Sequence, residues 1–377
     1  MLIRTRVWSM PIRMTAPNSN TIILTARCHC KSNQFTIEVP RSALPLRYAL
    51  CQCDTCRHTT GNLAAGTISF PYSLGIPKPD VTNLVEYKTS ENLPRYFCGT
   101  CGAHICTIEP DCWDVMTGIV DQTGDLVERL NIWSNDTGDG GLGAYFTEHK
   151  GEKVKNYCTN GREETGDIEM VTEETIRDYK NKSKIVAAAE KNEFGESNER
   201  LHCRCHCGGV DFYLTLPNPH TPGPDPNKLD KNDGFWWLAG KKYRTSICSC
   251  ESCRLCSGFE INTWIYAPKA NLVWNNGKPL QFNEGTLKSY ESTPGTVIRE
   301  FCSVCGAKVF YRAPARREPS GVLDIAPGLI VGMDSRAEEW LKWEPETGFE
   351  DDALDPEFVI SINDGISKWN KEAAGTE

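Results

Sequence analysis

Apolar residues along the chain fall into short runs separated by turn-forming residues, a pattern typical of β-strands. These runs are rich in β-branched and aromatic side chains. The clearest are TIILTA at 21–26, FTIEV at 35–39, DFYLTL at 211–216, WIYA at 264–267, KVFYR at 308–312 and FVISI at 358–362. Helical signals are confined to the middle of the chain and to SRAEEWLKW at 335–343, which fits one short helix. The pattern predicts a mainly β protein.

The composition changes between residues 159 and 199, where Glu and Lys are dense and aromatic residues are scarce. Charges of both signs recur here at helical spacing, with Ile176 and Tyr179 on another face, so this segment is predicted to be a solvated helical linker. A chain of 377 residues is long enough for two domains. We expect a first domain at 21–158, a linker at 159–199, a second domain at 200–350 and a C-terminal tail at 351–377.

The two halves of the chain carry one cysteine pattern in the same order: C-x-C, then C-x-C-x-x-C, then C-x-x-C-G. The equivalent cysteines are Cys28, Cys30, Cys51, Cys53, Cys56, Cys98 and Cys101 in the first half, and Cys205, Cys207, Cys248, Cys250, Cys253, Cys302 and Cys305 in the second. Other residues recur with them, namely Arg57 and Arg254, Gly61 and Gly258, Arg95 and Arg299, Asp114 and Asp324, and Gly118 and Gly328. The second copy has a longer segment between its first two motifs, which contains Trp236 and Trp237 and is expected to be a loop.

Seven thiols in each half divide naturally into a group of four and a group of three. Zinc is tetrahedral, so a closed structural site takes four protein ligands, whereas a catalytic site keeps one position open. Pairing the C-x-C motif with the C-x-x-C-G turn would tie the first strand of each half to a later hairpin. The C-x-C-x-x-C cluster would then supply three ligands and leave one position for water or an added thiol. We therefore predict about two zinc ions per domain.

Two alternatives remain open for these cysteines. Disulfides would require an oxidising compartment, which the sequence does not indicate. Both groups would be purely structural if a distant histidine or a further cysteine supplied a fourth ligand to the three-thiol cluster. The candidates are Cys106, Cys158, Cys203 and Cys256, which with Cys112 are the five cysteines that do not recur at an equivalent place. His29 and His206, which lie between paired cysteines, are expected to be oriented by the turn and are not first-choice ligands.

A zinc ion held by three thiolates carries a net charge near −1, so it is a poor Lewis acid. It would nevertheless keep an added thiol as thiolate near neutral pH, where a free thiol with a pKa of about 8.5 is mostly protonated. The implied chemistry is nucleophilic addition of sulfur to a small carbonyl compound. Arg57 and Arg254 directly follow the third cysteine of each cluster and are candidates to bind the carboxylate of the thiol substrate. Surface ion pairing is the alternative for both.

Charge and targeting signals narrow the choice of partner and compartment. Lys and Arg number 41 against 50 Asp and Glu, and the net charge of −9 disfavours nucleic acid. No run approaches the roughly 18 apolar residues of a membrane span, so a membrane protein is not expected. Residues 1–37 lack acidic side chains, as in mitochondrial presequences and in ordinary polar tails. We favour an untargeted amino end and a cytoplasmic location, where thiols stay reduced.

These motifs resemble the glutathione-dependent formaldehyde-activating enzyme family, whose domain is also called CENP-V/GFA, in two tandem copies. The resemblance covers about residues 21–158 and 200–350 and is carried by CHCGGVDF, CSCESCR and REFCSVCG of the second copy. The first copy departs at CHCKSNQF, where Lys31 and Asn33 replace the usual glycine and valine. The resemblance implies two β-tent domains built from antiparallel sheets.

The resemblance also implies roles for the cysteines. A structural zinc is implied at Cys28, Cys30, Cys98 and Cys101, and at Cys205, Cys207, Cys302 and Cys305. A catalytic zinc is implied at Cys51, Cys53 and Cys56, and at Cys248, Cys250 and Cys253, where glutathione would bind and S-(hydroxymethyl)glutathione would form from formaldehyde. The leading hypothesis is a zinc-dependent carbon–sulfur lyase acting on a small thiol and a small electrophile. The competing hypothesis is a non-catalytic, zinc-stabilised interaction module.

Overall fold

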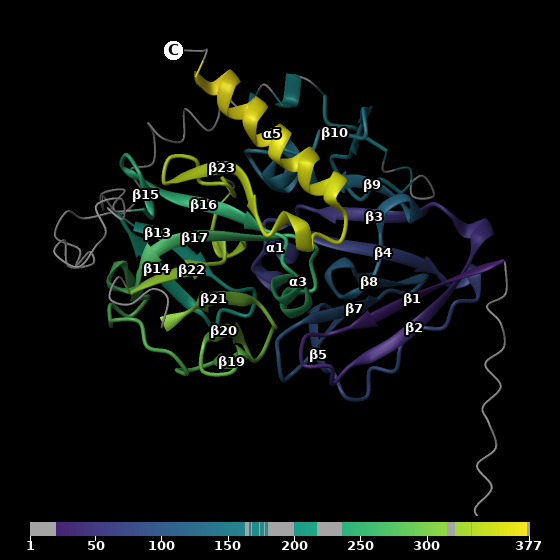
Figure 1. Ribbon diagram of the computed structural model, residues 1–377, viewed down its shortest axis with the longest axis horizontal. Helices are drawn as coiled ribbons and strands as arrows, with labels where there is room; N and C mark the ends of the chain where they lie inside the picture. Colours follow the sequence, from purple (N-terminus) through teal and green to yellow (C-terminus); the bar gives the residue numbers. More distant parts are fainter. Residues whose placement is uncertain are drawn as a thin grey trace, which may run out of the picture.

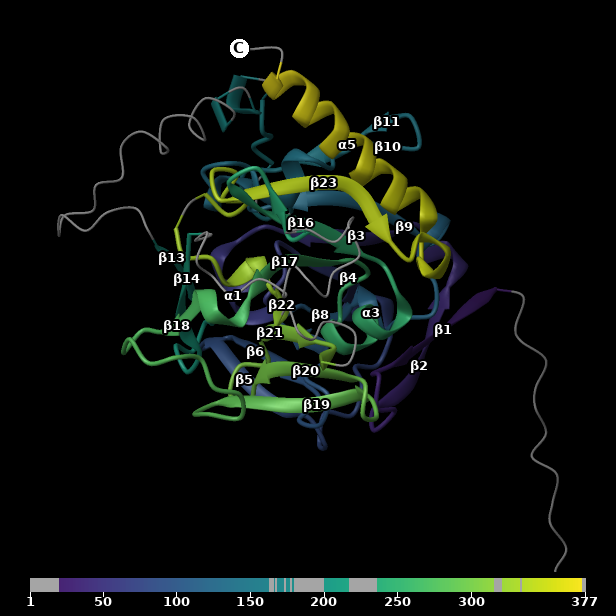
Figure 2. The ribbon, with the colours of Figure 1, turned by 60° about the vertical axis from the view of Figure 1, so that its left-hand side comes forward.

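The computed structural model describes residues 20–162, 166, 168–172, 174–176, 178–179, 200–216, 236–314, 321–332 and 334–374. Two β-rich repeats lie side by side, and one long helix, α5 (Pro356–Ala374), runs over both (Figures 1 and 2). Residues 20–162 are called the first repeat and the described residues of 200–350 the second repeat. The prediction of a mainly β protein is confirmed. Within the described residues, no helix is long and apolar enough to cross a membrane.

The first repeat is built on one large sheet. Its strands are β3 (Leu46–Cys51), β4 (Ala65–Pro71), β5 (Val85–Ser90), β6 (Leu93–Phe97), β7 (His104–Ile108), β8 (Cys112–Met116), β9 (Val127–Ile132) and β12 (Lys155–Asn156). Their order is β12-β9-β3-β4-β8-β7-β6-β5. Two hairpins stand apart from it, β1 (Thr21–Arg27) with β2 (Gln34–Pro40) and β10 (Glu148–His149) with β11 (Glu152–Lys153). The short helix α1 (Asp54–Thr60) joins β3 to β4.

The second repeat has the same plan. Its main-sheet strands are β15 (Leu238–Ala239), β16 (Lys242–Cys248), β17 (Asn262–Pro268), β19 (Leu287–Thr293), β20 (Val297–Cys302), β21 (Lys308–Arg312), β22 (Val322–Ile325) and β23 (Leu341–Gly348). The order is β15-β16-β17-β22-β21-β20-β19, and β23 also pairs with β16. A three-stranded sheet contains β13 (Arg200–Arg204), β14 (Asp211–Thr215) and β18 (Leu272–Trp274). Helix α3 (Glu251–Ser257) is the counterpart of α1.

Both main sheets depart from a purely antiparallel arrangement at one edge. Strand β9 runs parallel to β3, and β23 runs parallel to β16. The register confirms the equivalence of the two edges, since Cys51 at the end of β3 lies opposite Ile132 and Cys248 at the end of β16 lies opposite Gly348. Apart from these pairs and the short parallel pair of β12 with β9, the strands of both main sheets pair antiparallel, as expected.

Two sequence-based element predictions are wrong. Residues 335–343 were expected to be a helix, but they form turns leading into β23. Leu341 and Trp343 are both buried, and this spacing of two residues belongs to a strand. FVISI at 358–362 was expected to be a strand, but it is the first part of α5.

Three sequence regions fall wholly or partly outside the described residues. The amino-terminal 19 residues, expected to be untargeted, and most of the insertion before Trp236, expected to be a loop, lie outside the described residues. In the linker, residues 174–176 and 178–179 are helical. Tyr179 is buried, and its hydroxyl donates to Asn135 Oδ1 at 3.0 Å. This part of the linker packs against the first repeat.

Glycines at equivalent positions join the repeats through reciprocal main-chain hydrogen bonds. The N–H of Gly118 donates to Gly258 O at 2.8 Å, and the N–H of Gly328 donates to Gly61 O at 3.0 Å. A Cβ added at Gly118 would lie only 2.2 Å from the backbone nitrogen of Phe259, so no side chain fits at this position. The recurring glycines therefore let α1 and α3 approach the opposite repeat closely, at the centre of Figure 1.

The histidines of the two C-x-C motifs form a second reciprocal contact. His29 Nδ1 hydrogen-bonds to Tyr290 Oη across the interface at 2.8 Å, and His206 Nδ1 hydrogen-bonds to Tyr87 Oη at 2.6 Å. In each pair the rings meet edge to face, with centroids 5.6 Å apart. These contacts relate the two repeats by an approximate two-fold axis.

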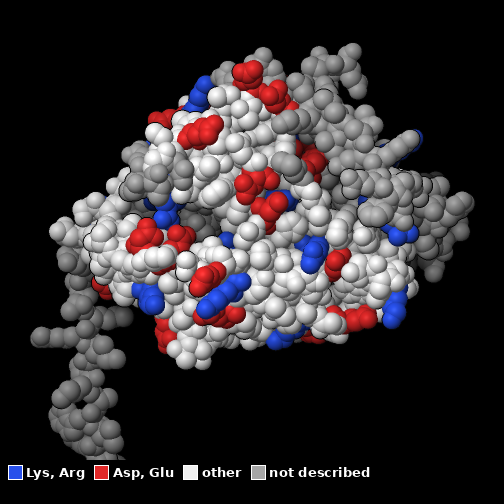
Figure 3. Space-filling view, turned by 180° about the vertical axis from the view of Figure 1, so that it is seen from behind, with Lys and Arg blue, Asp and Glu red and all other residues white. Residues whose placement is uncertain are grey.

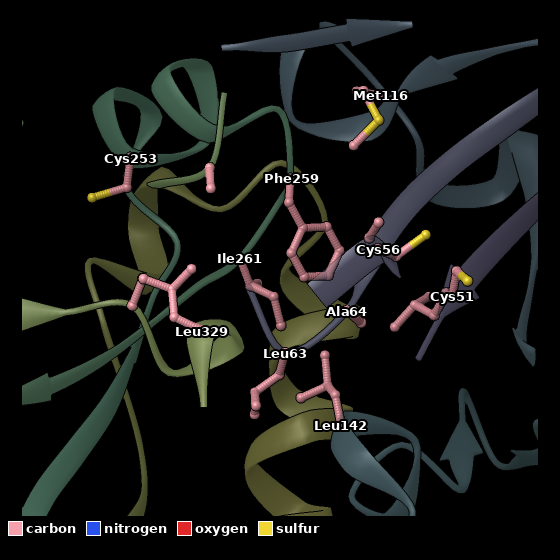
Figure 4. Packing of buried hydrophobic residues seen from close by; sticks show 14 of the residues in the cluster. Cys51, Cys56, Leu63, Ala64, Met116, Leu142, Cys253, Phe259, Ile261 and Leu329 are labelled. Atoms are coloured by element: carbon pink, nitrogen blue, oxygen red, sulfur yellow. The ribbon is translucent and has the colours of Figure 1, made fainter. Parts of the chain in front are cut away.

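Apolar side chains from both repeats form one continuous core. Figure 4 shows Phe259 and Ile261 of the second repeat beside Leu63 and Ala64 of the first. The outer surface is different in character. On the face shown in Figure 3, basic and acidic side chains are interspersed without a continuous basic area.

Candidate metal centres and thiol site

Each repeat gathers four thiols into one compact group. Cys28 and Cys30 follow β1, and Cys98 and Cys101 follow β6; their four sulfur atoms lie within 4.8 Å of one another. The sulfur of Cys30 lies 3.5 Å from those of Cys28 and Cys98. Sulfur atoms on a tetrahedral zinc would lie about 3.8 Å apart. The spacing and the soft donors therefore fit a zinc ion enclosed by protein ligands.

The second repeat contains an equivalent four-thiol group, formed by Cys205, Cys207, Cys302 and Cys305. The sulfur of Cys207 lies 3.5 Å from those of Cys205 and Cys302. Three of the four cysteines are buried and Cys207 is half-buried. Each four-thiol group joins the start of its repeat to a later turn, which follows β6 in the first repeat and β20 in the second. Metal binding there would tie these two parts of the repeat together.

Three further thiols meet where a strand of each main sheet runs into a short helix. In the second repeat Cys248 ends β16, Cys250 is the N-cap of α3 and Cys253 lies in the first turn of that helix. The Cys253 N–H donates to Cys250 Sγ at 3.4 Å, and the sulfurs of Cys248 and Cys253 are 3.6 Å apart. The strand, cap and helix thus aim three sulfurs at one point.

The first repeat places its three thiols in the same way. Cys51 ends β3, Cys53 caps α1 and Cys56 lies one turn later. The Cys56 N–H donates to Cys53 Sγ at 3.3 Å. Among the described residues, no fourth Cys, His, Asp or Glu completes either three-thiol group within 4.8 Å. The five further cysteines of the chain, Cys106, Cys112, Cys158, Cys203 and Cys256, belong to none of these thiol groups.

An arginine from another strand of the same main sheet faces each three-thiol group. In the second repeat Arg299 donates to Cys253 Sγ at 3.4 Å from both of its terminal nitrogens. Hydrogen bonds from Cys248 and Cys250, followed by the charge of Arg299, hold the pKa of the Cys253 thiol well below its usual range. The arginine therefore favours thiolate at this position.

The first repeat has the same pairing, in which Arg95 donates to Cys56 Sγ at 3.2 Å. Hydrogen bonds from Cys51 and Cys53, with the charge of Arg95, lower the pKa of the Cys56 thiol. Arg95 and Arg299 were not predicted to be site residues. The signal that could have identified them was present, because both recur at equivalent positions of the two halves.

The arginines belong to a row of paired residues that crosses each sheet. In the second repeat, Tyr266 pairs with Asp324, Asp324 with Tyr311, Tyr311 with Arg299, and Arg299 with Tyr290. Directly paired residues point to the same face of a sheet. The equivalent row of the first repeat is Ser69, Asp114, Thr107, Arg95 and Tyr87. We call these the second and first cross-strand rows.

A pocket opens beside the second three-thiol group. Its volume is about 360 Å³, and Cys248, Cys250 and Cys253 all line it. Residues of the second cross-strand row form one wall, including Arg299, and Phe349 lies at its side. A small molecule in this pocket would therefore be in contact with the thiols and the guanidinium group together.

The family comparison agrees with this arrangement. The model for the glutathione-dependent formaldehyde-activating enzyme matches residues 23–136 and 237–342. The chain belongs to this family. No curated protein and no solved structure matches it. The first matched region of the family includes all seven repeated cysteines of the first repeat, whereas the second begins after Cys205 and Cys207.

Arg57 and Arg254 occupy a different place from the one expected. Arg254 is buried and donates to Gly118 O at 2.8 Å and to Val120 O at 3.0 Å, both in the first repeat. Arg57 is also buried and donates to Ile330 O of the second repeat at 3.5 Å, as well as to Asp54. Their guanidinium groups are bound to main-chain carbonyls of the opposite repeat, so they join the repeats instead of facing a substrate carboxylate.

Proposed function

We propose that this protein is a zinc-dependent carbon–sulfur lyase that reversibly adds a thiol such as glutathione to formaldehyde or another small electrophile. The observation that carries the proposal is the contrast between the two kinds of thiol group. Four sulfurs surround one point in each structural group, whereas three sulfurs leave one tetrahedral position free in the other. In the second repeat, the three-thiol group also lines a pocket.

Each group has a distinct role in this proposal. The three-thiol groups would hold the zinc that takes part in catalysis, and the four-thiol groups would hold structural zinc. The ion, when bound, supplies positive charge that keeps an added thiol in its thiolate form near neutral pH. We also propose that the two units are residues 21–158 and 200–350, joined by the linker at 159–199.

The residues of the second repeat have separate tasks. Cys248, Cys250 and Cys253, at the end of β16 and the start of α3, would hold the metal ion. Arg299 compensates the negative charge of the three thiolates through its contact with Cys253. In the reaction, the substrate sulfur bonds to the carbonyl carbon, the π pair moves to oxygen, and oxygen takes the proton that the thiol has lost. The addition needs no oxidant or reductant.

Zinc K-edge absorption with and without glutathione tests this proposal. We expect about four zinc ions per chain, with some of the sites changing their coordination when glutathione is added. A non-catalytic interaction module would instead keep every ion fully enclosed by protein ligands, with a spectrum that glutathione does not change. The second result would contradict the proposed activity.

Cysteine substitutions separate the two kinds of group. Cys248→Ser should remove the second site's contribution to turnover while zinc stays in the four-thiol groups and the fold is largely retained. Cys302→Ser should release structural zinc and unfold the second repeat, because a three-ligand structural site no longer closes. Zinc content and circular dichroism measured on both variants would distinguish these outcomes. Identical behaviour would contradict the division into four and three.

A further inference from the structure

The residues beside the two three-thiol groups differ between the repeats. Trp264 and Thr67 hold equivalent register positions on the strands that follow α3 and α1. Tyr311 and Thr107 are likewise equivalent, and both pair with the repeated aspartate. A third pair, Tyr266 and Ser69, also faces that aspartate. The second repeat therefore has three aromatic residues where the first has three small hydroxyl residues.

The aromatic residues pack together around the second pocket. Trp264 and Tyr311 have ring centroids 6.0 Å apart, and the guanidinium carbon of Arg299 lies 4.9 Å from the Tyr311 ring. Trp264, Tyr266 and Tyr311 all line the pocket, and Phe349, at 63% exposure, presents another ring to it. A pocket lined by several aromatic rings and a few convergent polar groups is typical of a small-molecule site.

The first repeat uses the equivalent positions differently. Thr107 donates to Asp114 Oδ2 at 3.3 Å, and Ser69 also hydrogen-bonds to this carboxyl group. The first row therefore satisfies its aspartate with short hydroxyl side chains, and it provides no aromatic wall at these three positions. Both repeats keep the arginine and the three thiols. The two sites therefore differ in the side chains that a substrate would contact, and not in the thiol group itself.

We propose, on the basis of the proposed function, that the second site takes a carbonyl compound that carries an aromatic ring. Formaldehyde has no apolar group that could cover these aromatic walls. An aromatic aldehyde places its ring among Trp264, Tyr266 and Tyr311 while its carbonyl carbon faces the thiol position. The thiol sulfur bonds to that carbon, and the carbonyl oxygen gains the thiol proton, as with formaldehyde.

The test compares benzaldehyde with formaldehyde, each incubated with glutathione and the zinc-loaded full chain. Exchange NMR measures the rate at which each aldehyde enters and leaves its glutathione adduct, so the position of equilibrium does not matter. We expect the protein to accelerate exchange of both. Replacing Tyr266 and Tyr311 by the first-repeat residues, Tyr266→Ser with Tyr311→Thr, should lower the benzaldehyde-to-formaldehyde rate ratio about tenfold or more, because two ring contacts are lost.

Two control variants accompany this comparison. Tyr311→Phe keeps the ring and should keep the ratio. Tyr72→Ser removes an exposed tyrosine on the segment after β4 and should also leave the ratio unchanged. If the double variant loses zinc or cooperative unfolding, the single change Tyr266→Ser, at a half-buried position, decides the question.

The outcomes separate this inference from the proposed function. Acceleration with formaldehyde but not with benzaldehyde would overturn the aromatic specificity and leave the lyase proposal standing. An equal loss for both aldehydes in the double variant would also overturn it, because the rings would then serve only the fold or the thiol. If neither aldehyde is accelerated by the unsubstituted protein, the lyase proposal fails and this inference fails with it.

Discussion

Asp114 is a buried carboxyl group in the middle of the first cross-strand row, between Ser69 and Thr107. Burial raises its pKa to about 6, and the charge of Glu109 adds to the shift, whereas Arg162 and Arg47 oppose it. An acid with a raised pKa in the folded state binds a proton there more tightly than in the unfolded chain. The free energy of unfolding therefore falls as the pH rises through this range.

Asp114→Asn tests this effect. Removing the titration should make the free energy of unfolding less dependent on pH between about 4 and 6, and the variant should gain up to about 3 kcal/mol relative to the natural protein across that interval. Urea unfolding at several pH values measures the difference. Because both proteins carry the same metal-binding thiols, protonation of those thiols affects both alike. Parallel pH profiles would contradict a raised pKa for Asp114.

At the scale of single residues, the sequence predicted the thiol groups better than their surroundings. Spacing alone indicated a four-and-three division, because C-x-C, C-x-C-x-x-C and C-x-x-C are local motifs. The roles of Arg57 and Arg299 depend on the opposite repeat and on cross-strand register. A motif within one loop cannot specify which arginine in the chain faces the thiols and which faces the other repeat.

At the scale of elements, helix α3 depends on a close approach to the first repeat. Its C-cap, Gly258, has φ +88°, and an added Cβ would lie 2.4 Å from the carbonyl oxygen of His104. Gly75, which ends a short 3-10 turn (Tyr72–Leu74), has φ +68° with nothing within 4 Å of its added Cβ. The two glycines share a left-handed backbone conformation, but only Gly258 lacks room for a side chain.

Alanine at these positions separates the two effects. Gly75→Ala should cost about 1 kcal/mol of stability, since only the backbone conformation is strained. Gly258→Ala should cost a further 1 to 3 kcal/mol or so, because the repeats must move apart. Denaturant unfolding of the zinc-loaded chain measures both. Equal losses would show that the repeats do not need close contact at α3.

Helix α5 shows why the element predictions near the C-terminus failed. FVISI is apolar and β-branched over five residues, so a short window favours a strand. Over its full length, the buried residues Phe358, Ile362, Ile366 and Trp369 recur at helical spacing. Strand β23, in contrast, buries Leu341 and Trp343, which are two residues apart as in a strand. The helix-forming residues just before them hid this two-residue period. Both errors arise from deciding the period over too few residues.

At the scale of the whole molecule, α5 holds the two repeats together from outside. Phe358 packs edge to face against Phe146 of the first repeat, and Trp369 Nε1 donates to Glu338 of the second at 3.2 Å. The helix also passes so close to the first repeat that an added Cβ at Gly365 would lie 1.6 Å from Tyr145 O. Residues expected to be a tail are therefore part of the shared core.

A pair of isoleucines on α5 tests this role. Ile362→Ala should destabilise the protein by about 2 to 5 kcal/mol, because it removes a fully buried side chain. Ile360→Ala, at 48% exposure on the same helix, should change stability by less than about 0.5 kcal/mol. Thermal unfolding of both variants compares them. A small loss for Ile362→Ala would mean that α5 is not required for the packing of the repeats.

The reciprocal contacts between the repeats have a consequence for how the molecule can change over time. If two separate, identical chains met across this interface, every substitution would appear on both sides of the axis at once. Covalent fusion removes that constraint, because Trp264 and Thr67 are encoded independently while the glycines and histidines that hold the halves together stay matched. One half can thus acquire a new specificity while its twin preserves the old one.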